Sequence, residues 1–459
     1  GKSVTLLNAT SPGRGRELWI HDRAGTRLLK DQAPGSANSD PNRFTFVRGK
    51  AVFFSRIGNQ TELYVTDGTT GGTGLLKDVR PGRSSSFPRE PVSCGDKMFF
   101  VANDGTHGLE PWVTDGTTAG TFQLRDIHAG TSGSFPRHWT RVGERICFAA
   151  DDGSNGTELW VTDGTVAGTQ LVLDIRPGPA GSFPAQLYSW RGWLYFAANN
   201  GTAGVELWVT DGRPGIALLL KDLRPGSTGS NPGEFAAMGS KLYFSANDGR
   251  FGSEIWATDG TAAGTAQVLD VNRGPNGSGP TDLTVCGAKL YFAAVSGSGT
   301  ELHVSDGTPT GTMMLRDIYP GTSGSRPAQL TCSGRFVYFT ATDETLGTAT
   351  GRELYRTDGT PAGTILVRDL VPGAGSGSPR DLLPAGNGGL YFQARGPNGI
   401  EVFYTDGTGP GTRVVCETQP GDCDSGFGGR GRDRVCWGGP RRSKSAGGSG
   451  WCRGSWRGR

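Results

Sequence analysis

The chain lacks long apolar runs, is poor in lysine and has no long stretch rich in alanine and glutamate. No segment approaches the roughly 18 consecutive apolar residues of a membrane-spanning helix, so the sequence predicts no membrane span. Its apolar residues come instead in short runs between clusters of Gly, Asp and Pro, which is the pattern of an all-β protein.

The sequence also lacks the motifs of common enzymes and metal sites. The five histidines have no metal-ligand spacing, no CxxC pair occurs, and GxSxG, HExxH and GxxxxGK[ST] are absent. Paired carboxylates are too abundant here to be diagnostic. These absences favour a non-enzymatic protein, although they leave the question of catalysis open.

Acidic residues outnumber basic ones outside the C-terminal segment. Residues 424–459 carry nine Arg or Lys against two Asp, which leaves 37 basic and 41 acidic residues in the rest of the chain. The net charge of +3 therefore comes from the tail, and the mildly acidic body gives no reason to expect nucleic-acid binding.

The eight cysteines fall into two groups of four. We expect Cys94, Cys147, Cys286 and Cys332 to be small buried hydrophobic residues. In a secreted protein, Cys416 and Cys423 could close a short loop. The chain starts at Gly1 without Met or a signal peptide, so we expect either a removed signal or a fragment.

Glycine and proline are abundant, at 77 and 27 of 459 residues, and they punctuate a repeat. Each copy begins with a glutamate, and successive glutamates are 45, 48, 48, 48, 48, 47, 52 and 48 residues apart. A fixed period of this size indicates a repeat architecture. The glutamates are Glu17, Glu62, Glu110, Glu158, Glu206, Glu254, Glu301, Glu353 and Glu401.

One period predicts four short strands. In residues 185–222 these are "AQLYSW", "WLYFAAN", "VELWVT" and "IALLLKDL", separated by turn residues. Both faces of the second strand are apolar, with Leu194 and Phe196 on one face and Tyr195 and Ala197 on the other. A sheet that buries both faces needs a neighbour on each side, and this favours a β-propeller of four-stranded blades.

The blade number is eight or nine, and the copy count favours nine. Eight copies contain all four strands, whereas the first copy lacks its leading strand. A strand from the C-terminus would complete it. We expect a single propeller over residues 1–420 and an irregular, basic Gly/Arg-rich tail over 421–459. That tail reads either as disordered chain or as the out-of-frame product of a GC-rich gene.

The repeat motif resembles the ELWxxDGT repeat family of bacterial secreted and surface proteins. The resemblance rests on segments such as "ELWVTDGTVAGT" at 158–169 and "EIWATDGTAAGT" at 254–265, followed by "LVxDIxPGxxGS"-type sequence, and covers about nine-tenths of the chain. It implies an extracellular or cell-surface location. It implies no particular activity, because the family is defined by its repeat.

Two aspartate positions recur. The Asp of "TDGT" is expected to cap a hairpin by accepting backbone N–H bonds. The loops "NDGTHGLE", "DDGSNGTE" and "NDGRFGSE" are rich in oxygen ligands and glycine, as calcium sites are, so Asp104, Asp152 and Asp248 are the candidate metal ligands. An ordinary hairpin loop uses the same residues, and the spacing of an EF-hand is absent.

The aromatic residue of "ELW" is expected to pack between blades rather than to bind sugar. Taken together, the sequence predicts a secreted, non-enzymatic binding or scaffold propeller of unknown ligand. The partner is an extracellular polysaccharide or protein, or a second copy through self-association. The alternatives are a calcium-assisted, lectin-like glycan binder and a polysaccharide-active enzyme.

Overall fold

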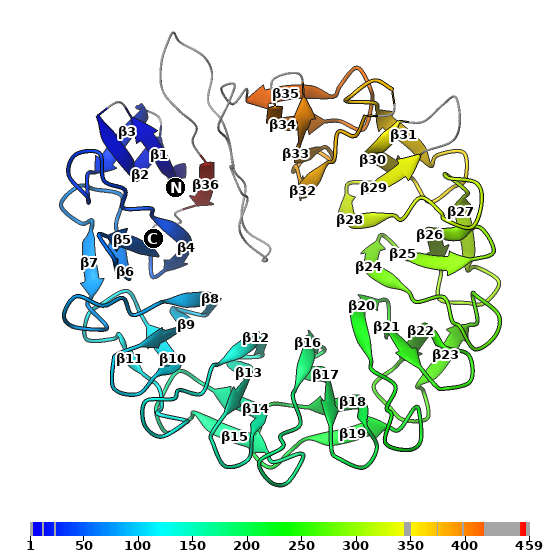
Figure 1. Cartoon of the computed structure of the whole chain (residues 1–459), viewed down its shortest axis with the longest axis horizontal. Helices are drawn as coiled ribbons and strands as arrows, with labels where there is room; N and C mark the ends of the chain where they lie inside the picture. The colour runs from blue at the N-terminus through cyan, green and yellow to red at the C-terminus, as the bar shows by residue number, and fades with distance from the viewer. Residues whose placement is uncertain are drawn as a thin grey trace. The chain divides into compact units, whose positions relative to one another are not determined.

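The computed structural model describes residues 3–11, 13–22, 24–343, 350–373, 375–396, 399–416 and 450–455. These residues form strands and no helix, so this part of the chain contains no helix able to cross a membrane. The strands form nine antiparallel four-stranded sheets, and the fold is a nine-bladed β-propeller (Figure 1). The predicted fold class and the favoured blade number are confirmed.

The chain divides into two compact units, residues 1–194, 210–217 and 424–459 in the first and residues 195–209 and 218–423 in the second. Blade 5 contains the boundary. Blades 1 to 5 consist of β1 (Ser3–Ser11), β2 (Arg14–Asp22), β3 (Gly25–Lys30) and β36 (Gly450–Ser455); β4 (Asn42–Val47), β5 (Lys50–Ile57), β6 (Gln60–Thr66) and β7 (Gly74–Lys77); β8 (Arg89–Cys94), β9 (Lys97–Asn103), β10 (Leu109–Thr114) and β11 (Phe122–Gln123); β12 (Arg137–Val142), β13 (Arg145–Asp151), β14 (Thr157–Thr162) and β15 (Gln170–Leu173); and β16 (Ala185–Trp190), β17 (Trp193–Asn199), β18 (Val205–Thr210) and β19 (Leu218–Lys221).

Blades 6 to 9 follow in chain order. They consist of β20 (Gly233–Met238), β21 (Lys241–Asn247), β22 (Ser253–Thr258) and β23 (Ala266–Leu269); β24 (Thr281–Cys286), β25 (Lys289–Ser296), β26 (Gly299–Ser305) and β27 (Met313–Arg316); β28 (Ala328–Ser333), β29 (Phe336–Asp343), β30 (Gly351–Thr357) and β31 (Ile365–Arg368); and β32 (Arg380–Pro384), β33 (Leu390–Gly396), β34 (Gly399–Thr405) and β35 (Arg413–Cys416).

The C-terminal segment supplies the fourth strand of blade 1. Strand β36 pairs antiparallel with β1, with Ser3 opposite Ser455 and Asn8 opposite Gly450. The repeat count predicts a closing strand of this kind. Strand β36 lies within the segment 421–459, which the sequence predicts to be irregular. The remainder of that segment lies outside the described residues.

Each blade buries both of its faces. In β13, Ile146, Phe148 and Ala150 alternate with Cys147 and Ala149, and all five are fully buried. The first three pack in one cluster with residues of blade 3. Similar clusters join blades 1 and 2, 2 and 3, 6 and 7, 7 and 8, and 8 and 9. The sequence predicts this burial, because the second strand of the repeat has apolar residues on both of its faces.

The tryptophan of the "ELW" motif packs between blades, as the sequence predicts. Trp112 and Trp160 are buried and belong to the clusters that join blades 2 and 3 and blades 3 and 4. A cation from the preceding blade covers each ring: the Nζ of Lys77 lies 5.9 Å from the Trp112 ring, and the guanidinium of Arg125 lies 5.5 Å from that of Trp160.

The same cations fasten neighbouring blades through the backbone. Lys77 Nζ donates to the carbonyl oxygen of Thr121 at 2.6 Å, and Arg125 donates to that of Thr169 at 3.0 Å. The bond recurs in four further blades, where the cation is the last residue of the fourth strand and its acceptor lies one blade on. The further pairs are Lys30 with Thr73, Lys221 with Thr265, Arg316 with Thr364, and Arg368 with Thr412.

The first strands of neighbouring blades lie side by side, β8 beside β12 and β12 beside β16 in the first unit, and β24 beside β28 in the second. A disulfide joins Cys286 of β24 to Cys332 of β28, with 5.4 Å between their Cα atoms. The expectation that these two cysteines are free buried residues is therefore wrong. Cys94 and Cys147 are free and buried, as expected.

The disulfide should contribute measurably to stability, because it closes a long loop between two blades. We expect the variant C286S/C332S to be about 2–4 kcal/mol less stable than the wild type, as measured by thermal and denaturant unfolding. In the wild type, a linked peptide pair containing Cys286 and Cys332 should appear in a non-reducing digest. Recovery of both cysteines as alkylated free thiols without reductant would contradict the assignment. C147A is the matched control, because it removes a buried thiol without removing a cross-link.

Candidate functional site

Each blade carries two sets of loops, one at each end of its strands. The turn between the first and second strands and the "DGT" loop lie at one end. The loop between the second and third strands lies at the other end, together with the linker to the next blade. The candidate binding residues of the sequence lie at the second end.

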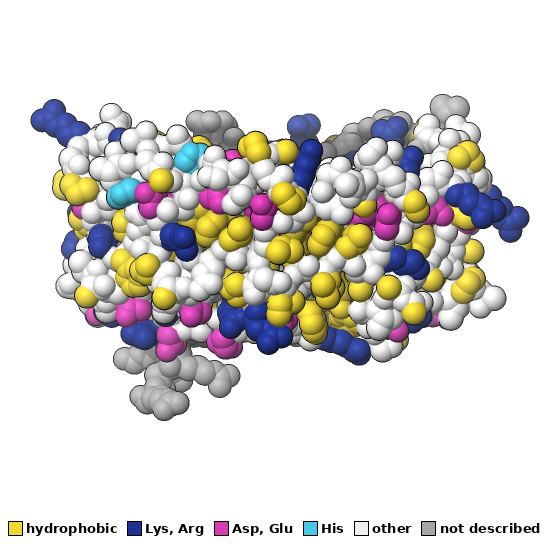
Figure 2. All heavy atoms as spheres, turned by 90° about the horizontal axis from the view of Figure 1, so that it is seen from below, with side chains coloured by type: hydrophobic (Ala, Val, Ile, Leu, Met, Phe, Trp, Pro, Cys, Tyr) yellow, Lys and Arg dark blue, Asp and Glu magenta, His cyan; other side chains and the backbone are white. Residues whose placement is uncertain are grey.

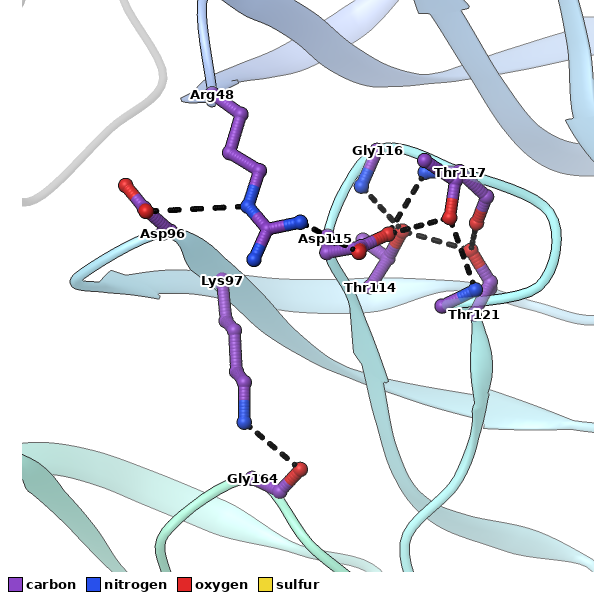
Figure 3. A network of polar contacts seen from close by, with 10 residues as sticks. Arg48, Asp96, Lys97, Thr114, Asp115, Gly116, Thr117, Thr121 and Gly164 are labelled. Atoms are coloured by element: carbon purple, nitrogen blue, oxygen red, sulfur yellow. Dashed lines mark hydrogen bonds and ion pairs between the residues drawn. The ribbon is translucent and has the colours of Figure 1, made fainter.

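The "DGT" loop is a self-contained structural turn. Asp115 Oδ1 accepts hydrogen bonds from the backbone N–H of Thr117 at 3.0 Å and from its hydroxyl at 2.6 Å (Figure 3). The hydroxyl bond in particular holds the pKa of Asp115 below its ordinary value. A Cβ at Gly120 would lie 2.0 Å from this carboxylate, so the loop needs glycine there. The predicted hairpin cap is confirmed.

This end of the propeller also fastens blades to each other. Arg48, in the first turn of blade 2, donates to Asp115 Oδ2 of blade 3 at 2.9 Å and lies 3.8 Å from Asp96 (Figure 3). Lys97 of blade 3 donates to the carbonyl oxygen of Gly164 in blade 4 at 3.1 Å. These polar side chains are engaged within the fold, which makes this end a poor candidate for ligand binding.

At the other end, the glutamate that opens each repeat of blades 1 to 8 is buried and holds the linker to the next blade, an arrangement that we call the clamp. Glu158 is fully buried, and its carboxylate accepts backbone N–H bonds from Ile175 at 3.3 Å, Arg176 at 3.3 Å and Ser182 at 2.7 Å. The Ser182 hydroxyl also donates to it. The linker after the fourth strand is therefore wrapped around one carboxylate.

The clamp recurs with the same partner 24 residues on. The pairs are Glu62 with Ser86, Glu110 with Ser134, Glu206 with Ser230, Glu254 with Ser278, and Glu301 with Ser325. In blade 8 the partner is the backbone of Gly377, bonded to Glu353. This pairing is not among the features predicted from the sequence, although the constant spacing of Glu and Ser was a visible signal.

The linker serine connects two blades. Its N–H and hydroxyl bond the glutamate of its own blade, and its carbonyl oxygen accepts from the second strand of the next. The distance is 3.0 Å from Asp151 N to Ser134 O and 2.9 Å from Asn247 N to Ser230 O. The backbone of this end is consequently fixed from both sides, and its outward side chains project from a rigid frame.

The three candidate metal ligands lie at this end, each in the loop of a different blade and each bonded within its own loop. Asp104 accepts from the backbone N–H groups of Thr106 and His107, at 2.8 and 2.9 Å, and from the His107 ring at 2.7 Å. Although burial acts to raise it, these bonds lower the pKa of Asp104 to about 2. The His107 ring therefore occupies the position beside the Asp104 carboxylate that a bound cation would take.

Asp152 and Asp248 are bonded in the same way. Asp152 Oδ1 accepts from Ser154 and Asn155, and Asp248 Oδ1 accepts from Arg250 and Phe251. Across the described ranges, no three His, Cys, Asp or Glu side chains are grouped so that they could hold a metal ion. The structure therefore explains these aspartates as loop caps, and calcium binding stays a prediction.

Comparisons with known proteins find similarity to solved structures. No model of a protein family and no curated protein matches this chain. Among solved structures it is similar to a prolyl endopeptidase (TM-score 0.38, 14% identity) over 79% of this chain and 54% of that one. It is also similar to a puromycin hydrolase (0.38, 14%) over 78% of this chain and 58% of that one. A third is the dihydro-heme d1 dehydrogenase NirN (0.40, 12%), over 75% of this chain and 68% of that one.

The clamp predicts an unusual dependence of stability on pH. Burial raises the pKa of Glu158 to about 7, so between pH 4.5 and 7 the folded state binds a proton more tightly than the unfolded state. The stability that this group contributes is complete below about pH 4.5 and is lost as pH rises through 7, at about 1.4 kcal/mol for each unit of pKa shift.

We therefore expect the Tm of E158Q relative to the wild type to rise between pH 5 and pH 8, because glutamine keeps the shape and carries no charge. E144Q changes a carboxylate whose side chain is 82% exposed and should show a constant difference. Parallel pH profiles of E158Q and the wild type would contradict the assignment.

Proposed function

We propose that this chain is a non-enzymatic binding or scaffold propeller that acts outside the cell or at its surface. The observation that carries the proposal is a linker position whose backbone is constant and whose side chain varies. It follows the clamped serine, or Gly377 in blade 8, and its φ lies between 42° and 54° in all eight linkers. The residues are Asp40, Phe87, Phe135, Phe183, Asn231, Gly279, Arg326 and Ser378.

The backbone at this position is held by the fold. The N–H of Phe183 donates to the carbonyl oxygen of Thr157 at 3.0 Å, and that of Asn231 donates to Val205 at the same distance. A rigid scaffold that presents different side chains at equivalent points is the usual design of a binding surface. In contrast, the polar residues that recur in every blade are engaged in clamps and turns, as a supporting frame requires.

The location is supported by the disulfide between Cys286 and Cys332, since disulfides persist in oxidising compartments. From the disulfide and the repeat motif we also infer that the chain is related to the secreted ELWxxDGT proteins. Its partner is an extracellular polysaccharide or protein. Figure 2 shows acidic and basic side chains interspersed on one side of the molecule, with no uniform basic field of the kind that nucleic acids attract.

The test compares binding with turnover. Purified protein is incubated with a panel of extracellular polysaccharides and peptides, and retention on the immobilised polymers is measured alongside release of reducing ends and new amino termini. We expect retention without turnover. Turnover of any polymer would contradict the proposal in favour of an enzyme.

The same retention experiment in EDTA separates the calcium-assisted alternative. Loss of retention in EDTA, restored by calcium and reduced by D104N or D152N, would establish a calcium-assisted glycan binder. Retention that EDTA leaves unchanged supports binding through the side chains alone. Light scattering after size exclusion measures self-association, the remaining scaffold interaction.

A further inference from the structure

Three consecutive linkers of the first unit carry an exposed phenylalanine at the variable position. Phe87, Phe135 and Phe183 are 58%, 47% and 56% exposed. Their φ angles are 50°, 49° and 51°, in the left-handed region that bulky residues rarely adopt. Each therefore combines exposure of an aromatic ring with a strained backbone.

Neither feature is required by folding. Other linkers fill the same backbone position with Asp40, Asn231 and Gly279, residue types that tolerate positive φ at little cost. Strain and exposure that folding does not explain are typical of functional positions.

The three rings form a row. Each phenylalanine stands two residues before the first strand of a blade, β8, β12 and β16, and these strands lie side by side. A proline follows each phenylalanine and restricts the backbone between ring and strand. About half of each residue is exposed, so each ring is accessible to a ligand.

Basic groups flank the row. Arg89 and Arg137 start β8 and β12, two residues after Phe87 and Phe135. The Nε of Arg89 is buried and has no hydrogen-bond partner among the described residues. A ligand carboxylate therefore has to pair with the terminal nitrogens of this guanidinium, whose planar fork matches a carboxylate.

We propose that Phe87, Phe135 and Phe183 form a stacking row for an acidic polysaccharide, whose sugar faces lie on the rings and whose carboxylates pair with Arg89 and Arg137. The inference rests on the proposed binding function and names the ligand class and the site. The exposed carboxylate of Glu90 lies in the same row. Its negative charge would repel a uniformly anionic surface such as a membrane. An acidic polysaccharide carries its carboxylates at intervals, so they can lie away from Glu90.

The test measures binding of polygalacturonate oligomers by calorimetry. The comparison probes are a dextran of matched length and vesicles of phosphatidylcholine and phosphatidylserine. The key variant is F87N/F135N/F183N, because asparagine occupies the equivalent position at Asn231 and keeps the backbone. We expect its affinity for polygalacturonate to fall at least about 30-fold, with about 3–10-fold per ring, and its Tm to be equal to or above that of the wild type.

R89Q/R137Q should lose the preference for polygalacturonate over dextran. V166N changes a residue that is 59% exposed in the "DGT" loop of blade 4, and it should bind as the wild type does.

Unchanged affinity in the triple variant would overturn the proposal, as would absence of polygalacturonate binding by the wild type. Vesicle binding that depends on the three rings, without polygalacturonate binding, would replace it with a membrane surface. Each of these results leaves a binding propeller in place if another polymer is retained. Cleavage of polygalacturonate, by contrast, would overturn the proposed non-enzymatic function itself.

Discussion

The architecture depends on one interaction, a carboxylate removed from water that must find all of its hydrogen-bond donors in the linker. Glu158 illustrates it: the backbone of Ile175, Arg176 and Ser182 converges on the two carboxylate oxygens. A buried charge left without donors would cost several kcal/mol, about the whole stability of a small domain, so the linker has one favourable path. That path fixes where the next blade begins and which side chains face outward.

Much of this was predictable from the sequence. Apolar residues on both faces of β17 require neighbours on both sides, and the period of about 48 residues then predicts blades. The hairpin role of Asp115 follows from residue chemistry alone, because Asp-Gly favours a tight turn. In these cases the determining interactions lie within one short segment, where sequence spacing and spatial distance agree.

The features that escaped prediction join segments one blade apart. Cys286 and Cys332 meet only because β24 and β28 are neighbouring first strands, a relation that depends on strand order. The bond from Lys77 to the carbonyl oxygen of Thr121 has the same character. Likewise, the letters "SFP" repeat three times, yet nothing in them reveals that Phe135 has a positive φ. The sequence instead directs attention to Asp104 and its counterparts. In the structure, the carboxylate oxygens of these residues are held by their own loops.

Contacts that extend only to neighbouring blades affect how a repeat protein of this kind evolves. Clamps, cation bonds and apolar clusters connect a blade to itself and to its immediate neighbours, as expected of a repeat protein. Unequal recombination between two copies in the gene would therefore delete or duplicate a whole blade and leave the glutamate clamp at each remaining junction. The three phenylalanine linkers have the sequence "SFP" in common, as such copying would produce, and the proposed ligand row would lengthen by one subsite with each blade duplicated.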